Sequence, residues 1–402
     1  MRNIYSLLAA IAMTTAAYAQ QQWTYYNTGL TTDIYSVFFI DSTTGWVAGA
    51  GGFVKKTTAG GVTGSWVSQN STVTLPIRSI YMVNSSTGWM VGDDGTIVKT
   101  TNGGSTWTPQ TQSTTQDFYG VYFVDANTGW AVGTGPMILK TTNGGTTWSP
   151  QTVPGSNDLF SIWMINSSTG YACGENGTFL STTDGGTTWN TETTSTTDSL
   201  KSLCFASATE GFVVGKNSKV LNTDGSVFTN VQPVSDETFN SVYFVNDTTG
   251  WVVGDSGKIY MTKNAGQTWT LQNSQTAQRL FSVHFPHDSV GYCGGKNGLF
   301  RKYRVPSGVG MNEADKAALG MSVYPNPASG LFSVSFFHSS SGNVKIELFD
   351  LTGKPVKVMQ HNLPSGEQTV KINIRELMLP EGIYFVRLND GSSQSVSKLI
   401  IN

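Results

Sequence analysis

Three features of the sequence contain residue types that could perform chemistry. Residues 254–257 read Gly-Asp-Ser-Gly, which places a serine and an acidic residue in a loop, as serine hydrolases place their nucleophile. His284 and His287 are separated by an interval that metal ligands use. The third feature is the set of arginines and carboxylates in the chain, because a glycoside hydrolase would use such residues to clamp and cleave an acidic sugar. Which feature is functional depends on the elements that hold it.

Those elements belong to a repeat with a period near 41 residues. In the third unit, turn residues separate four expected strands at 118–124, 129–133, 137–140 and 148–151. Four strands in each 40 to 45 residues or so is the period of a β-propeller. The sequence therefore predicts an all-β protein with a seven-bladed β-propeller over residues 20–304, followed by a small C-terminal β-sandwich. A Gly-aromatic pair marks each unit and begins at Gly45, Gly88, Gly129, Gly170, Gly211, Gly250 and Gly291.

A second aromatic column shows how the ring closes. It runs from Trp66 to Trp269, and no member follows Gly291. Trp23 precedes Trp66 by one repeat length and is followed by a similar polar segment. An open edge strand would invite pairing with other chains. We therefore expect a strand at Trp23 to complete the seventh blade.

An eight-residue turn between the third and fourth strands is the most specific signature in the chain. It reads Thr-Thr-Asn/Asp-Gly-Gly-Ser/Thr-Thr-Trp at 100–107, 141–148 and 182–189, with a further copy at 262–269. It resembles the Asp-box of sialidase-type propellers, in which side-chain oxygens bond to backbone amides and glycine supplies unusual dihedrals. We expect a structural role for Asn102, Trp107, Asn143, Trp148, Asp184, Trp189, Asn264 and Trp269.

The repeats change the interpretation of the three chemical features. Residues 254–257 occupy the hairpin that other units fill with an acidic residue or asparagine before glycine, so a turn is predicted there. No cysteine or carboxylate cluster accompanies His284 and His287. Two arginines near the expected ligand face cannot supply the three-arginine clamp of a sialidase. The sequence predicts no catalytic residue, no metal and no cofactor, and a glycan-cleaving hydrolase remains the enzymatic alternative.

A ligand site is expected where the inner strands stop repeating. Two positions before a uniform apolar column, the residue type varies from unit to unit, at the mouth of the face opposite the Asp-boxes. Aromatic and cationic side chains around a concavity suit a peptide or a glycan. The alternative is that this position simply tolerates variation. The candidates are Tyr35, Arg78, Tyr119, Phe160, Lys201 and Phe281, with Asp93, Asp94, Glu175 and Asp255 on the neighbouring turns.

The repeats together resemble the photosystem II assembly factor family. Thr-Gly-Trp-x-Val-Gly followed by Thr-x-Asn-Gly-Gly-x-Thr-Trp recurs, and the resemblance spans roughly residues 22–304. It implies a propeller that acts as an assembly chaperone for a membrane complex through an arginine-rich patch. The arginines of this propeller are Arg78, Arg279, Arg301 and Arg304.

The last 81 residues or so resemble the type A sorting domain of the type IX secretion system. Four motifs occur in order: Ser-Val-Tyr-Pro-Asn-Pro-Ala-Ser-Gly from 322, Glu-Leu-Phe-Asp-Leu-Thr-Gly-Lys from 347, Leu-Pro-Glu-Gly-Ile-Tyr-Phe-Val-Arg-Leu from 379 and Ser-Lys-Leu-Ile-Ile-Asn from 397. The resemblance implies recognition by the type IX secretion machinery and export across the outer membrane of a Bacteroidota-type bacterium. The alternative is an adhesive or carbohydrate-binding sandwich.

The ends of the chain and its composition agree with export. Residues 1–19 carry an apolar run and end in Ala17-Tyr18-Ala19, which predicts a signal peptide and passage through the periplasm. A linker is expected at 305–321. No later segment is apolar enough to span a bilayer. The chain has 24 Lys+Arg and 26 Asp+Glu, so it lacks the excess of positive charge that contacts with phosphates require. Nucleic acid is therefore not an expected partner.

The chain has three cysteines, Cys173, Cys204 and Cys293, which are expected to be buried free thiols, with a disulfide as the alternative.

Taken together, the sequence favours a secreted or surface protein whose propeller binds a protein or polysaccharide. A glycan hydrolase and an envelope assembly chaperone are the alternatives.

Overall fold

The computed structural model describes residues 23–231, 233, 236–304, 321–338, 341–350, 354–377, 379–390 and 394–401. The predicted signal peptide and residues 305–320 of the predicted linker lie outside this part of the chain. The chain divides into two compact units, Met1–Val305 and Pro306–Asn402. None of the helices in the described residues has the length and apolar character needed to cross a membrane.

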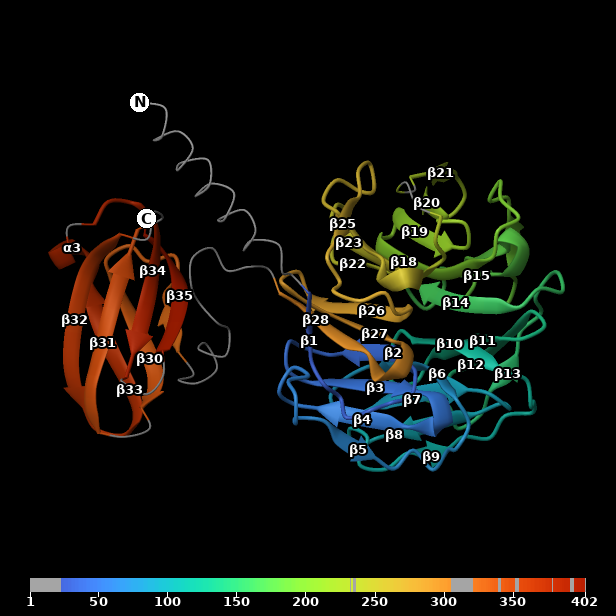
Figure 1. Ribbon diagram of the computed structural model, residues 1–402, viewed down its shortest axis with the longest axis horizontal. Coiled ribbons are helices and arrows are strands. Elements are labelled where there is room, and N and C mark those ends of the chain that lie inside the picture. Colours follow the sequence, from blue (N-terminus) through green and yellow to red (C-terminus); the bar gives the residue numbers. More distant parts are fainter. Residues whose placement is uncertain are drawn as a thin grey trace. The chain divides into compact units, whose positions relative to one another are not determined.

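The described residues 23–304 form seven four-stranded antiparallel sheets, which are the blades of a β-propeller (Figure 1). The fold class expected from the repeats is confirmed. Blade one contains β2 (Ile34–Phe39), β3 (Gly45–Gly49), β4 (Val54–Thr57) and β5 (Val67–Gln69). Blade two contains β6 (Ile77–Met82), β7 (Gly88–Gly92), β8 (Ile97–Thr100) and β9 (Thr108–Pro109). Blade three contains β10 (Phe118–Phe123), β11 (Gly129–Gly133), β12 (Met137–Thr141) and β13 (Ser149–Pro150).

The remaining blades repeat this order. Blade four contains β14 (Leu159–Met164), β15 (Gly170–Gly174), β16 (Phe179–Thr182) and β17 (Asn190–Glu192). Blade five contains β18 (Leu200–Ser207), β19 (Glu210–Gly215), β20 (Val220–Thr223) and β21 (Phe228–Asn230). Blade six contains β22 (Phe239–Phe244), β23 (Gly250–Gly254), β24 (Ile259–Thr262) and β25 (Thr270–Gln272). Blade seven contains β26 (Leu280–His287), β27 (Val290–Gly295), β28 (Phe300–Arg304) and β1 (Trp23–Tyr25).

The N-terminal strand supplies the outer strand of blade seven. β1 runs antiparallel to β28 and pairs Trp23 with Tyr303. The inner strand of the same blade, β26, packs against β2 of blade one and β22 of blade six. The first and last strands of the propeller therefore meet in one sheet, and this sheet closes the ring.

The Gly-aromatic pairs repeat because each blade makes the same close contacts. In blade three, a Cβ atom on Gly129 would lie 2.4 Å from the ring of Phe123 on the neighbouring strand, so only glycine fits. The tryptophan of the preceding blade, Trp89, stacks on that ring with centroids 3.5 Å apart. Its indole N–H donates to the Gly144 carbonyl in blade three. The pair thus joins each blade to the next.

In the Asp-box turns, side-chain oxygens bond to backbone amides of the same turn. In the copy of blade three, the Thr141 hydroxyl accepts from the Gly145 amide at 2.8 Å, and Asn143 Oδ1 accepts from the Thr147 amide at 2.9 Å. Gly144 and Gly145 have φ of 69° and 89°, values that favour glycine. Trp148 is 6 % exposed. The turn therefore satisfies its own backbone and buries one ring.

The acidic member of this set, Asp184, gives a pH-dependent prediction. Hydrogen bonds from the Thr188 amide and hydroxyl hold the pKa of the Asp184 carboxyl at about 2, below its usual value of 3.8. A depressed folded-state pKa contributes stability above the unfolded pKa and loses it as the pH falls through the folded pKa. Asp184→Asn keeps the hydrogen-bond geometry of its sister turns. The gap in melting temperature between wild type and Asp184→Asn should therefore be largest above about pH 4 and shrink towards about pH 2. A gap that does not change with pH would contradict this.

A serine near the start of the inner strand connects neighbouring blades. The Ser36 hydroxyl of blade one accepts from the Ile80 amide of blade two at 3.1 Å. Ser282 of blade seven does the same for Val37 of blade one. These hydrogen bonds join inner strands that otherwise belong to separate sheets.

The second unit is a β-sandwich of two antiparallel sheets. One sheet has the order β29-β30-β33 and the other β32-β31-β34-β35, with α3 (Ile374–Leu377) after β33. Its buried core includes Phe332, Ile346 and Leu399. The strands are β29 (Ser322–Tyr324), β30 (Leu331–His338), β31 (Gly342–Phe349), β32 (Pro355–Leu363), β33 (Gly366–Asn373), β34 (Gly382–Asn389) and β35 (Gln394–Ile401).

Candidate functional site

A bulge at the start of every inner strand places the candidate side chains. In each blade the register with the second strand shifts between the first and third residues of the inner strand, as between Phe118 and Gly120. The residue in the middle has no partner across the ladder, and bulges commonly re-aim such a side chain. The seven bulged residues, called the mouth ring below, are Tyr35, Arg78, Tyr119, Phe160, Lys201, Asn240 and Phe281.

The mouth ring and the Asp-boxes belong to opposite faces of the propeller. Arg78 of the ring contacts Asp93, which lies in the turn between the second and third strands of blade two. The Asp-box of the same blade instead donates the Gly103 amide to the Ser86 carbonyl, in the turn between the first and second strands. Changes to the two sets can therefore be made independently.

Side chains on blades two, one and seven form one contact chain across the mouth. Arg78 bonds to both oxygens of Asp93, at 2.7 and 2.9 Å, and these bonds raise the pKa of its guanidinium. The guanidinium carbon lies 4.8 Å from the Tyr35 ring centroid. Tyr35 meets Phe281 edge to face, with centroids 5.3 Å apart. Ion pair, cation–π contact and ring pair hold these side chains in one arrangement.

Blades three, four and five contribute a second group. Tyr119 and Phe160 pair with centroids 5.4 Å apart, and Lys201 Nζ lies 3.6 Å from the Phe160 centroid. Burial, and then the like charge of Lys216, lower the pKa of the Lys201 ammonium. Among the described residues, Lys201 makes no ion pair within 4.0 Å. This half of the mouth presents a cation on an aromatic surface.

The acidic candidates have different environments. Asp93 pairs with Arg78, and Asp255 pairs with Arg279 and accepts from Asn240. Asp94 is exposed at the tip of its turn with φ of 52°. Glu175 begins η2 (Glu175–Gly177), and its charge opposes the lowering of the pKa of Lys201. The structure therefore brings Asp93 and Asp255 into the mouth contacts, while Asp94 lies at the edge.

A set of aspartates that the sequence analysis missed joins adjacent blades on this face. Asp117 accepts from the Asp94 amide at 2.9 Å, and Asp158 accepts from the Gly135 amide at 2.8 Å. Asp33 accepts from the Asn297 amide across the closing seam. Each lies directly before an inner strand. This recurring acidic position in the sequence is the signal that could have identified the set. These bonds fix the turns that border the mouth.

Below the mouth ring, three residues further along each inner strand, a second ring lines the axis. Neighbouring members contact each other, for example Phe38 with His284 at 4.6 Å and Tyr81 with Tyr122 at 4.9 Å between centroids. Burial lowers the pKa of His284 to about 3, so this imidazole is neutral at ordinary pH. The sequence analysis did not identify this ring, here called the aromatic collar. It consists of Phe38, Tyr81, Tyr122, Trp163, Cys204, Tyr243 and His284.

The groups of the aromatic collar are poorly suited to acid–base chemistry at ordinary pH. The collar contains no carboxylate, and burial raises the pKa of Tyr81, Tyr122 and Tyr243. Burial likewise raises the pKa of the Cys204 thiol to about 12. Groups whose pKa lies far from the working pH are poor general acids and bases. All three cysteines are free and buried.

The Gly-Asp-Ser-Gly segment and the two histidines do not come together in one site. Residues Asp255–Gly257 form a turn, η3, in which Ser256 has φ of 52°. His287 is exposed on the opposite face beside Asp288 and Ser289. Across the described residues, no group of three His, Cys, Asp or Glu side chains could hold a metal ion.

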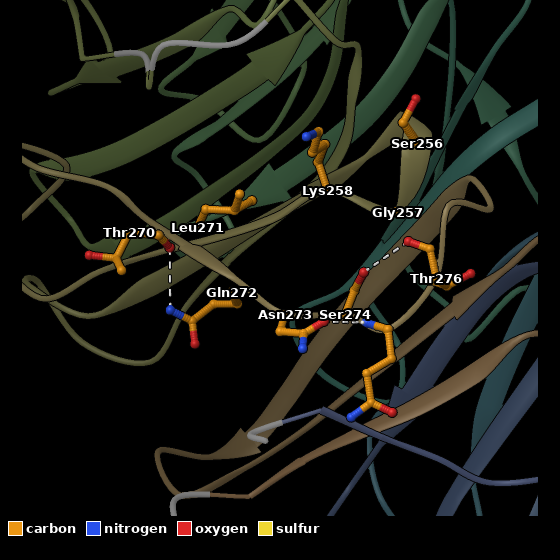
Figure 2. Close-up of a pocket in the computed structure, with 10 residues that line it drawn as sticks. Ser256, Gly257, Lys258, Thr270, Leu271, Gln272, Asn273, Ser274 and Thr276 are labelled. Atoms are coloured by element: carbon orange, nitrogen blue, oxygen red, sulfur yellow. Dashed lines mark hydrogen bonds between the residues drawn. The ribbon is translucent and has the colours of Figure 1, made fainter. Parts of the chain in front are cut away.

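A pocket of about 520 Å³ lies on the outer side of blade six (Figure 2). The segment from β25 to Thr276 and the turn at Ser256 line it, with Lys258 as the ionisable side chain. Gln272 and Ser274 bond to backbone carbonyls of their own segment. Apart from Ser256, the pocket contains none of the residues singled out in the sequence, and no carboxylate or histidine lines it. Its lining suggests no reaction.

Two family models match the chain. Residues 15–115, 65–159, 106–191 and 150–232 match overlapping copies of the model described as photosynthesis system II assembly factor YCF48. Residues 322–402 match the secretion system C-terminal sorting domain. A comparison with curated proteins finds no match.

Solved structures with the same fold include two of YCF48. One, from Cyanidioschyzon merolae, is 19% identical, with a TM-score of 0.61 over 71% of this chain and 100% of that chain. The other, YCF48 bound to D1 peptide, is 18% identical, with a TM-score of 0.61 over 71% and 97%. PorZ, a surface component of the type IX secretion system of Porphyromonas gingivalis, is 13% identical, with a TM-score of 0.54 over 92% and 59%. These likenesses show the fold.

Proposed function

The chain belongs to the photosynthesis system II assembly factor YCF48 family and ends in a sorting domain of the type IX secretion system, and from this premise we propose that it is a binding protein of the cell surface. Its propeller recognises a protein or a polysaccharide through the mouth ring. The sorting domain marks it as a secreted or cell-surface protein of a Bacteroidota-type bacterium.

The observation that carries this proposal is the break in the repeat at the mouth ring. The position two residues further on is apolar in every blade, from Val37 to Val283, because each blade meets the same neighbours. At the bulge the blades instead carry half-buried Tyr, Arg, Phe, Lys or Asn side chains. Six of them contact one another in the two groups described above. An asymmetric patch of aromatics and arginine on a symmetric scaffold is what recognition of an asymmetric ligand requires.

The same contacts argue against the hydrolase alternative. A glycosidase needs two carboxyl groups flanking the bond to be cleaved. Asp93 and Asp255 each pair with an arginine, at 2.7 Å in both cases. The guanidinium already bonds to both oxygens of each carboxylate, so neither carboxylate is free to flank a bond in a substrate. The described mouth residues therefore support binding better than cleavage.

The chaperone alternative has one supporting observation. A YCF48 structure was solved with a D1 peptide, so a peptide can occupy a propeller of this family. In this chain Arg78 and Arg279 are the arginines on the mouth face, and both are paired with aspartate. An assembly role would show itself as co-purification with a membrane complex, which a free polysaccharide binder would not give.

The experiment that tests the proposal is a binding screen on the purified chain lacking residues 1–19. The probes are outer-membrane proteins and cell-surface polysaccharides, and the same probes are assayed for cleavage. We expect saturable binding of one probe class with no turnover. Cleavage of a glycan would contradict the proposal and restore the hydrolase. Absence of binding to every probe would also contradict it.

A further inference from the structure

The seam between blades seven and one carries a nearly symmetric arrangement of side chains. Tyr35 and Phe281 form its centre, with ring centroids 5.3 Å apart. On one side Arg78 covers Tyr35 and pairs with Asp93. On the other, Arg279 lies 6.0 Å from the Phe281 centroid and pairs with Asp255 at 2.7 Å. An aromatic pair is thus flanked by two arginine–aspartate pairs.

Each arginine keeps one end free for a ligand. Arg78 and Arg279 both use Nε and Nη2 towards their aspartates. Nη1 of each guanidinium has no partner within the described residues, and it carries two N–H groups. The Arg78 and Arg279 side chains are 32 % and 52 % exposed. The seam therefore offers oriented donors beside carboxylate acceptors, and the two charges of each pair cancel.

From this geometry we propose that the seam is a subsite for a neutral pyranose chain. The proposal rests on the binding function above and names the ligand class. A pyranose ring has an apolar C–H face and hydroxyls on adjacent carbons that both donate and accept. The C–H face suits an aromatic surface, whose π-electrons attract positive edges. The hydroxyls match the guanidinium and carboxylate pairs, whose fork geometry is fixed.

Charge favours a neutral sugar over an acidic one at this place. A ligand carboxylate at the free Nη1 would lie close to the aspartate of the same pair, and like charges brought together repel each other. Lys201, a mouth cation that makes no ion pair within the described residues, belongs to blade five and not to the seam. An acidic polysaccharide would bind there instead, and the test below separates the two outcomes.

The experiment is a calorimetric titration of the full mature chain with cellohexaose, mannohexaose and laminarihexaose, and with a polygalacturonate oligomer as the acidic probe. Each is tested up to about 10 mM, since a dissociation constant near 1 mM is only about −4.1 kcal/mol of binding. At least one neutral hexasaccharide should bind. Tyr35→Ala and Phe281→Ala should each weaken it about tenfold or more, and Arg78→Lys should also weaken it, because lysine lacks the planar fork.

The matched control is Tyr25→Ala. Like Tyr35, Tyr25 is a tyrosine beside an arginine, with Arg301 5.3 Å from its ring, but it is exposed and lies on the outer strand of blade seven. Its affinity should stay within about twofold of wild type. The inference is overturned if no neutral hexasaccharide binds, if Tyr35→Ala and Phe281→Ala bind as wild type does, or if only the polygalacturonate binds. Protein capture through the mouth in those cases would leave the broader binding function standing.

Discussion

Replacing Trp23 by alanine should lower the free energy of unfolding by about 3 to 5 kcal/mol, the range for a buried tryptophan. Trp23 is fully buried in the sheet of blade seven. Its ring contacts Tyr303, with centroids 5.3 Å apart, and Phe285, at 5.9 Å. The strand itself adds backbone pairing with β28. Deleting residues 20–28 should cost more, because it removes both the ring and the strand that closes the propeller.

Thermal and urea unfolding of the purified chain check this prediction. Tyr25→Ala is the control, since Tyr25 lies on the same three-residue strand and is 50 % exposed. It should change the free energy of unfolding by no more than about 1 kcal/mol. The deletion should also promote aggregation, since it leaves the edge of β28 unpaired. An unchanged melting temperature in the deletion variant would show that the ring closes without β1.

Removing residues 322–402 should trap a folded propeller in the periplasm. These residues match the sorting domain, and they form a compact unit with its own core. The propeller core is built from other residues, so its stability should not depend on the removed strands. Fractionation into periplasm, outer membrane and medium, with a protease-resistance assay for folding, measures the result.

The converse fusion is the control for the export prediction. Residues 305–402 attached to an unrelated periplasmic reporter should carry that reporter to the surface or the medium. Wild-type surface levels of the truncated chain would contradict the prediction and would make the sandwich an adhesive module.

The propeller could be predicted from the sequence because its contacts repeat. Gly129 must be glycine because Phe123 fills the space of its side chain, and the same contact recurs with Phe39 against Gly45 and Phe244 against Gly250. A contact made in every blade leaves a residue pattern with the period of the blade. The turns with positive φ at Asn176 and Asn297 left the same kind of signal.

The residues of the candidate site could be identified from the sequence, but the contacts between them could not be predicted. Its members were found because they break the pattern, and a position outside the pattern carries no information on its partners. The pairing of Arg78 with Asp93 and its stacking on Tyr35 depend on the bulge and on the angle between blades. The aromatic collar was missed because Cys204 and His284 interrupt a column of large rings.

The sandwich was only partly resolved from its sequence. The sequence alternates in the manner of strands at 331–337, 344–349, 369–374, 383–388 and 395–401, and each of these stretches overlaps a strand of the structure. β32 was not among them. It is an edge strand that exposes polar side chains such as Gln360 and Asn362 and the apolar Val358, so the alternation that marks a half-buried strand is weak.

The most direct test of the mouth as the binding site compares three forms of the mature chain. Arg78, Tyr119 and Phe160 are replaced together by alanine in one, Trp148 alone in the second, and the third is wild type. Affinity for the probe that binds in the screen is measured by calorimetry, and stability by thermal melting. Trp148 is buried in an Asp-box on the other face, so Trp148→Ala should lower stability by about 3 to 5 kcal/mol and leave the affinity of the folded protein unchanged.

The triple-alanine form should do the reverse. It should weaken binding by about 1 to 4 kcal/mol, the range of interface hot spots, with a stability change of no more than about 1 kcal/mol because the three side chains are partly exposed. Wild-type affinity in the folded triple-alanine form would show that the propeller binds its ligand elsewhere.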